Sequence, residues 1–147
     1  MDPFSAISLA GIIVQFVDFS SKVVAKSQQI HKSVNGALLG HDDIELLTKD
    51  LLNLHQGLLI PLRPPGTTPG LSQEESELEI LRQHCDDVAR EILAALDSLK
   101  IRGEKTRWKS IRNALKSVWN ANQLATLEAR LAAFKHEINT RILVSLS

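Results

Sequence analysis

The chain opens with a long uncharged run that restricts what the rest of it can fold into. No Asp, Glu, Lys or Arg occurs between Asp2 and Asp18. Asp2 is a preferred N-cap residue type and Pro3 suits the first helical position, so the sequence predicts a helix from Pro3 to about Lys32. The apolar residues of its first half leave no polar face, and such a helix must be enclosed by protein or by lipid.

The length of this run lies just below that of a membrane span. Fifteen residues, Pro3 to Val17, make about 22 Å of helix, whereas the hydrocarbon core of a bilayer is about 30 Å thick. Extension to Val24 adds length but includes Asp18 and Lys22, and a central charge costs about 2.5–3.5 kcal/mol on insertion scales. The run therefore predicts a core helix and leaves open conditional entry into lipid. A signal peptide is not expected, because no Lys or Arg precedes the run.

Three further apolar stripes follow at helical spacing, and a fourth, shorter one lies between the last two. They are Ile44, Leu47, Leu51, Leu54 and Leu58; Leu78, Leu81, Cys85, Val88, Ile92, Ala95 and Leu99; Trp108, Ile111, Leu115 and Val118; and Leu124, Leu127, Leu131, Phe134, Ile138 and Ile142. Steps of three and four residues place each set on one helix face. The predicted fold is all-α: a four-helix bundle with an additional short helix and a central apolar N-terminal helix, as one domain over residues 1–147.

Turn and capping residues separate these helices. Asn35-Gly36 ends the first helix, and a loop rich in Pro and Gly follows Pro61. Ser72 with Glu75 predicts a capping box at the start of the third helix, and the segment 120–122 predicts a new N-cap before the last one.

Charge is unevenly distributed along a chain whose formal net charge is zero. The third helix is acidic, whereas the stretch from Lys100 to Lys116 holds seven Lys or Arg residues and one Glu. This stretch has four possible roles: a solvated face, a partner of the acidic helix, a surface for anionic lipid, or, without any supporting motif, a nucleic-acid surface. Trp108 and Trp119 are of a residue type that favours membrane interfaces.

The sequence carries no pattern typical of an enzyme, a metal site or a cofactor site. The glycines form no phosphate-binding loop, and the five histidines lack metal-ligand spacing. Cys85 lies on a core stripe, so we expect a buried thiol, and its neighbour His84 points about 100° away on a helix and cannot act as its base. We expect His31 and His41 to be solvated. A single cysteine excludes an internal disulfide and fits a reducing compartment.

Two parts of the chain resemble a known family. The opening Met1-Asp-Pro-Phe-Ser-Ala-Ile-Ser-Leu-Ala10, with the segments 14–19 and 21–22, is similar to the HeLo-like N-terminal domains of fungal STAND and NLR-like receptors. The similarity extends to Lys109-Ser-Ile-Arg-Asn-Ala-Leu-Lys-Ser-Val-Trp119 and to the helix containing Leu127-Glu-Ala-Arg-Leu131. In longer relatives such domains precede a nucleotide-binding or repeat sensor module. The resemblance implies a relation to HeLo cell-death domains, which oligomerise and expose an N-terminal helix to the plasma membrane.

This resemblance yields two functional hypotheses. The first is a cell-death effector, cytoplasmic at rest, that self-associates and inserts its first helix into the plasma membrane. Its membrane-inserting residues would be Phe4, Ile7, Leu9, Ile12, Ile13, Phe16 and Val17. Its anionic-surface residues would be Arg102, Lys105, Arg107, Lys109, Arg112 and Lys116. The second hypothesis is a soluble signalling or oligomerisation module that recruits a protein partner, with the first helix always in the core.

Overall fold

A computed structural model describes residues 3–32, 41–60, 73–103, 113 and 115–146. For residues 3–6, 41–43, 74, 100–103 and 144–146 only the backbone is described. Four long helices make up most of this part of the chain: α1 (Pro3–Lys32), α2 (His41–Leu58), α3 (Gln73–Gly103) and α5 (Ala121–Leu146). Residues 115–118 are also helical, and no strand occurs in the described ranges. The all-α prediction is confirmed.

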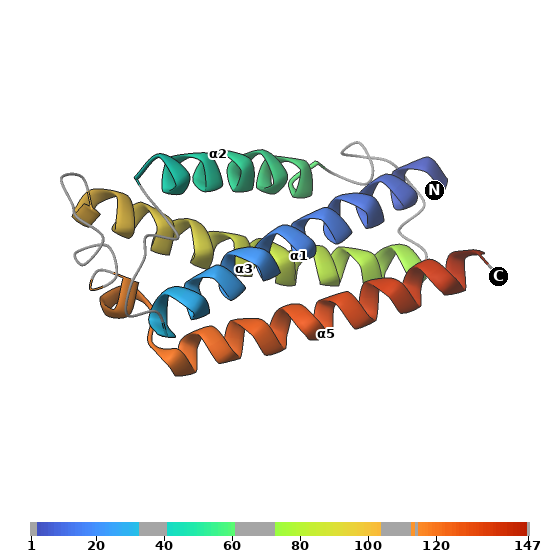
Figure 1. Cartoon of the computed structure of the whole chain (residues 1–147). Helices are drawn as coiled ribbons and strands as arrows, with labels where there is room; N and C mark the ends of the chain where they lie inside the picture. The colour runs from blue at the N-terminus through green and yellow to red at the C-terminus, as the bar shows by residue number, and fades with distance from the viewer. Residues whose placement is uncertain (1–2, 33–40, 61–72, 104–112, 114, 147) are drawn as a thin grey trace.

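The four long helices form a bundle in which successive helices run in opposite directions (Figure 1). α1 packs against α2, α3 and α5, so its predicted central position is confirmed. α3 also contacts the three other long helices, whereas α2 and α5 lie on opposite sides of the α1–α3 pair. The start of α1 and the end of α5 lie at the same end of the bundle.

The predicted stripes supply the core. Every member of the α3 stripe is buried, and so are five of the six members of the α5 stripe. In the α2 stripe, Ile44, Leu51 and Leu58 are buried, and the two stripe residues between them, Leu47 and Leu54, are half-buried. Ala89 and Leu96 widen the buried face of α3 beyond the predicted stripe. In the short stripe, Leu115 is buried, whereas Trp108 and Ile111 lie outside the described residues.

The prediction that α1 has no solvent-facing side is wrong. Ser8, Gly11, Gln15 and Asp18 are exposed at steps of three and four residues, which is one face of a helix. The buried face includes Ile13, whose side chain is fully enclosed. Three small or uncharged polar residues within the apolar run, Ser8, Gly11 and Gln15, are enough to give α1 an outer surface.

Two neighbouring isoleucines in α1 therefore differ in burial. The uncharged run predicts that Ile12, Ile13, Phe16 and Val17 are among the most buried residues. This is confirmed for Ile13, Phe16 and Val17, whereas Ile12 is only half-buried. An ideal Cβ at Gly57 of α2 would lie 3.4 Å from Cγ2 of Ile12, which places Ile12 at the α1–α2 boundary.

The ends of the helices agree with the predicted caps where they are described. The backbone N–H of Gln123 donates to Oδ1 of Asn120 at 2.7 Å, and the N–H of Asn120 donates to Oε1 of Gln123 at 2.8 Å. This reciprocal pair is a capping box at the start of α5. α3 continues past Leu99 to Gly103, and both Ser72 and the Asn35-Gly36 turn lie outside the described residues.

The burial of the two isoleucines predicts different costs of truncation. Ile13→Ala should lower the free energy of unfolding by about 2–5 kcal/mol, because it leaves a cavity in the core. Ile12→Ala should cost less than about half as much, because its side chain is partly in water. Urea denaturation of both variants checks this, and equal losses would contradict the packing of α1 described above.

Candidate functional site

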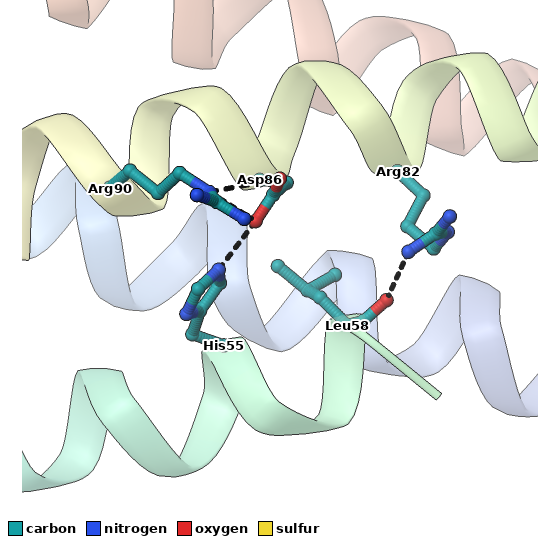
Figure 2. Close-up of polar contacts among 5 residues, drawn as sticks. All are labelled: His55, Leu58, Arg82, Asp86 and Arg90. Carbon is teal, nitrogen blue, oxygen red and sulfur yellow. Dashed lines mark hydrogen bonds and ion pairs between the residues drawn. The ribbon is translucent and has the colours of Figure 1, made fainter. Parts of the chain in front are cut away.

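A histidine–aspartate pair links α2 to α3. Nε2 of His55 donates to Oδ1 of Asp86 at 2.5 Å, and the Nε–H of Arg90, one turn further along α3, reaches both carboxylate oxygens at 3.2 Å (Figure 2). Burial raises the pKa of Asp86, but the hydrogen bonds from His55 and Arg90 outweigh it and hold that pKa below its ordinary value. The carboxylate is therefore held ionised between two helices.

A second link lies closer to the end of α2. Nη1 of Arg82 on α3 donates to the backbone carbonyl of Leu58 at 3.0 Å, as Figure 2 shows. The same guanidinium pairs with Glu79 through two nitrogens. Arg82 thus satisfies one of the carbonyls that a helix C-terminus leaves without an intrahelical partner.

Ion pairs also join α3 to α5. Nη1 of Arg130 lies 3.0 Å from Oε2 of Glu91, and Arg141 pairs with Glu77. Four acidic side chains of α3 therefore have partners. Glu77 and Glu91 pair with arginines of α5. Asp86 pairs with His55 of α2 and with Arg90, and Glu79 pairs with Arg82, within α3. Pairing of this helix with the basic stretch 100–116 stays a prediction, because most of that stretch lies outside the described residues.

α1 is held differently from the other helices. Its polar contact with another segment is at its C-terminal end, where Nε2 of His31 donates to the carbonyl of Trp119 at 2.7 Å. The expectation that His31 is solvated is therefore wrong, while the His41 side chain lies outside the described residues. Asp18 and the α1 lysines make no ion pair with any other described residue. The buried hydroxyl of Ser20 also lacks a hydrogen-bond partner there.

The structure places the proposed membrane-inserting residues on both sides of α1. Leu9, Ile13, Phe16 and Val17 are buried and Ile12 is half-buried, whereas Ile7 is exposed and the Phe4 side chain is not described. Within the described residues, Ile7–Lys32 is the one helical segment whose length and composition suffice to cross a membrane. The core helix of a soluble protein passes the same test, so this is weak evidence for a span.

The basic stretch is connected to the opposite end of the bundle from the start of α1. Lys116 is exposed and lies three residues before Trp119, which contacts the C-terminal end of α1. The thirty residues of α1 span about 45 Å, so Lys116 and the start of α1 are far apart. The side chain of Arg102 is not described, and Lys105, Arg107, Lys109 and Arg112 lie outside the described residues. Trp119 is buried and does not face an interface in this state.

A hollow of about 230 Å³ lies between α1 and α5. Val14, Val17 and Ile138 form its apolar wall, and Asp18, Lys135 and Asn139 its polar rim. No sequence pattern indicates this hollow, because its residues come from two helices more than a hundred positions apart.

Cys85 and its neighbour His84 have structural surroundings on α3. Cys85 is fully buried, and burial raises the pKa of its thiol to about 12. His84 stacks on the ring of Phe134, with centroids 6.1 Å apart. No group of three or more His, Cys, Asp or Glu side chains that could hold a metal occurs in the described part of the chain.

Comparisons with protein-family models, with curated proteins and with solved structures gave no match. The functional argument therefore depends on the packing and the polar links of this chain itself. They divide the bundle into three helices joined by polar links through α3, and a first helix that is held mainly by apolar contacts.

The Asp86 link predicts a pH-dependent contribution to stability. Asp86→Asn should lower the free energy of unfolding by about 1–3 kcal/mol at pH 7, because hydrogen bonds to a charged group are lost. A carboxyl with a lowered pKa in the folded state stabilises above its unfolded pKa, and this contribution disappears as pH falls through the folded value. Urea denaturation at pH 7 and pH 3 should therefore show a smaller difference from wild type at pH 3 than at pH 7. The exposed neighbour serves as control: Asp87→Asn should have little effect at either pH.

The basic stretch gives a separate prediction. If it meets anionic lipid, changing Lys105, Arg107, Lys109 and Arg112 together to Glu should abolish sedimentation with anionic vesicles. Wild-type binding should also fall steeply with salt, since surface charges are screened over about 8–10 Å at physiological ionic strength. Unchanged binding, or loss of the helical circular dichroism signal, would show instead that the stretch has a structural role.

Proposed function

We propose that this chain is a signalling domain of the HeLo-like type, which rests as a bundle in the cytoplasm and disturbs the plasma membrane after self-association. In its active state α1 leaves the other helices and enters lipid. The resemblance of the opening residues and of the segment Lys109–Trp119 to the HeLo-like N-terminal domains of fungal STAND and NLR-like receptors supports the biological setting.

One observation carries the proposal: among the described residues, the helix with the length and composition of a membrane span is joined to the other long helices by no side-chain ion pair. α2 and α5 are each joined to α3 by side-chain hydrogen bonds or ion pairs. Within the described residues, the side chain that joins α1 to another segment by a hydrogen bond is His31, at the C-terminal end of the helix. Its N-terminal half can therefore separate without breaking an ion pair of the described residues, and α2, α3 and α5 stay linked.

Separation would nevertheless expose apolar surface on both sides. Ile13, Phe16 and Val17 would lose their cover, and so would the stripes of the three helices that α1 contacts. Apolar surface in water favours insertion into lipid and association with other copies. Clustering of several copies can therefore act as the trigger, because it supplies partners for the surface that α1 leaves behind.

A second candidate is a soluble module that recruits a protein partner. It is favoured by the outer face of α1, where Ser8, Gly11, Gln15 and Asp18 meet water while the opposite face is buried. This arrangement is typical of an ordinary amphipathic core helix. In that case α1 stays in the bundle during signalling, and the two candidates differ in whether α1 moves.

A disulfide between α1 and α2 tests the proposal. An ideal Cβ at Gly57 lies 3.4 Å from Cγ2 and 3.9 Å from Cγ1 of Ile12, the two atoms bonded to the Cβ of Ile12. The Cβ atoms of Ile12→Cys and Gly57→Cys therefore lie near the separation of about 3.5–4.5 Å that a disulfide bridges. The protein is fused to an oligomerising tag and added to dye-loaded vesicles containing anionic lipid. We expect dye release from the reduced protein and none from the oxidised protein.

The single variants Ile12→Cys and Gly57→Cys, oxidised in parallel, control for the substitutions themselves. Cys85 does not interfere in the folded state, because it is buried and the high pKa of its thiol makes it unreactive. Full dye release by the oxidised double variant would refute the movement of α1 and favour the recruitment module.

A further inference from the structure

A serine hydroxyl on the buried face of α1 lacks a hydrogen-bond partner. Ser20 is fully buried, and its Oγ atom has no partner among the described residues. The residues one turn before it and one turn after it on the same face are apolar and at most 3% exposed: Phe16, Val17, Val23 and Val24. The hydroxyl is therefore enclosed in an apolar part of the core.

Other hydroxyls on the helices form a bond that Ser20 lacks. Ser27, seven positions further along the buried face of α1, donates from Oγ to the carbonyl of Val23 at 2.9 Å. Three threonines make the same bond to the carbonyl four residues earlier: Thr48 to Ile44, Thr126 to Asn122 and Thr140 to His136. A helical serine can thus satisfy its hydroxyl within its own helix, by a suitable rotamer.

The missing bond makes the resting position of α1 less favourable. Transfer of a hydroxyl from water into apolar surroundings lowers stability unless a new hydrogen bond compensates for the lost water. Ser27 has such a bond in the bundle and Ser20 does not, although both are buried. Ser20 therefore destabilises the packed state of α1, whereas Ser27 supplies an internal comparison without this penalty.

Separation of α1 from the other helices removes the penalty. A tightly packed core holds a side chain in one rotamer, and a released helix lets that side chain turn. In lipid, the hydroxyl of Ser20 can donate to the carbonyl of Phe16, as Ser27 donates to Val23 in the bundle. In water, solvent satisfies it. The hydroxyl is thus unsatisfied only while α1 is packed.

We propose that Ser20 is a destabilising element built into the fold, which keeps α1 close to release from the resting bundle. This inference rests on the proposed movement of α1 and concerns how that movement is regulated. The hydroxyl raises the free energy of the packed state and leaves the released state unaffected. A smaller gain from clustering and from lipid is then enough to shift the population toward the released state.

Ser20→Ala tests the proposal, because it removes the hydroxyl oxygen and leaves the apolar packing in place. The unfolding equilibrium constant from urea denaturation should fall on the order of ten-fold, since no unsatisfied hydroxyl remains. Native-state hydrogen exchange of the α1 amides should slow by a similar factor. Dye release from anionic vesicles by the protein fused to the oligomerising tag should slow too, because less α1 is released.

Ser27→Ala is the matched control. It makes α1 more apolar by the same change, but it removes a hydrogen bond that exists in the resting bundle. Its unfolding equilibrium constant should stay the same or rise, and its dye release should not slow. Greater hydrophobicity of α1 alone would act equally in both variants, so the difference between them isolates the unsatisfied hydroxyl.

Three outcomes would overturn the proposal. Unchanged or lower stability of Ser20→Ala would show that its hydroxyl is already satisfied at rest. Equal slowing of dye release by Ser20→Ala and Ser27→Ala would show that the missing bond is irrelevant. A gain in stability without slower exchange of the α1 amides would show that Ser20 does not affect the release of α1.

These results are distinguishable from failure of the proposed function. If the disulfide between α1 and α2 blocks dye release while Ser20→Ala releases dye as fast as wild type, the role of Ser20 is wrong and the movement of α1 stands. If Ser20→Ala slows exchange of the α1 amides but clustered wild-type protein never releases dye, Ser20 does destabilise packed α1 and the proposed membrane disturbance is wrong.

Discussion

The burial of one face of α1 against three other helices is the contact on which the rest of the bundle depends. Ile13, Phe16 and Val17 have almost no exposed surface, and α1 touches α2, α3 and α5. Without α1, the stripes of these helices would lose part of their cover. The opposite face of α1 is small and polar, so this apolar helix also has a side that is exposed on the bundle.

Polar links are distributed unequally around this core. α3 is linked to α2 through Asp86 and Arg82, and to α5 through Glu77 and Glu91. The hydrophobic contacts that hold α1 are non-directional, whereas hydrogen bonds and ion pairs require particular partners. A lipid environment can replace the first kind of contact but not the second. This difference is the physical basis for proposing that α1, and none of the other helices, exchanges protein for lipid.

The two ends of the bundle also differ in chemistry. One end (Figure 1) has the start of α1, in which no charged residue occurs between Asp2 and Asp18. The other has the His31–Trp119 contact and, close to it, the exposed Lys116. Because α1 is about 45 Å long, an upright bundle cannot place both ends on one membrane surface. Entry of the start of α1 into lipid and binding of anionic lipid through the basic stretch would therefore require different orientations of the bundle.

The sequence alone determined the helices and most of the core, since steps of three and four residues fix which side chains share a helix face. The stripe from Leu78 to Leu99 and the cap at Asn120 could be predicted because both depend on residues close together in the chain. Only the tertiary structure decided which long-range pairs form: His55 and Asp86 are 31 positions apart, and His31 and Trp119 are 88 apart. It also decided that Ile12 is only half-buried beside the enclosed Ile13. The physical reason is that local spacing sets the direction of a side chain from its own helix, whereas its neighbours depend on how the helices pack.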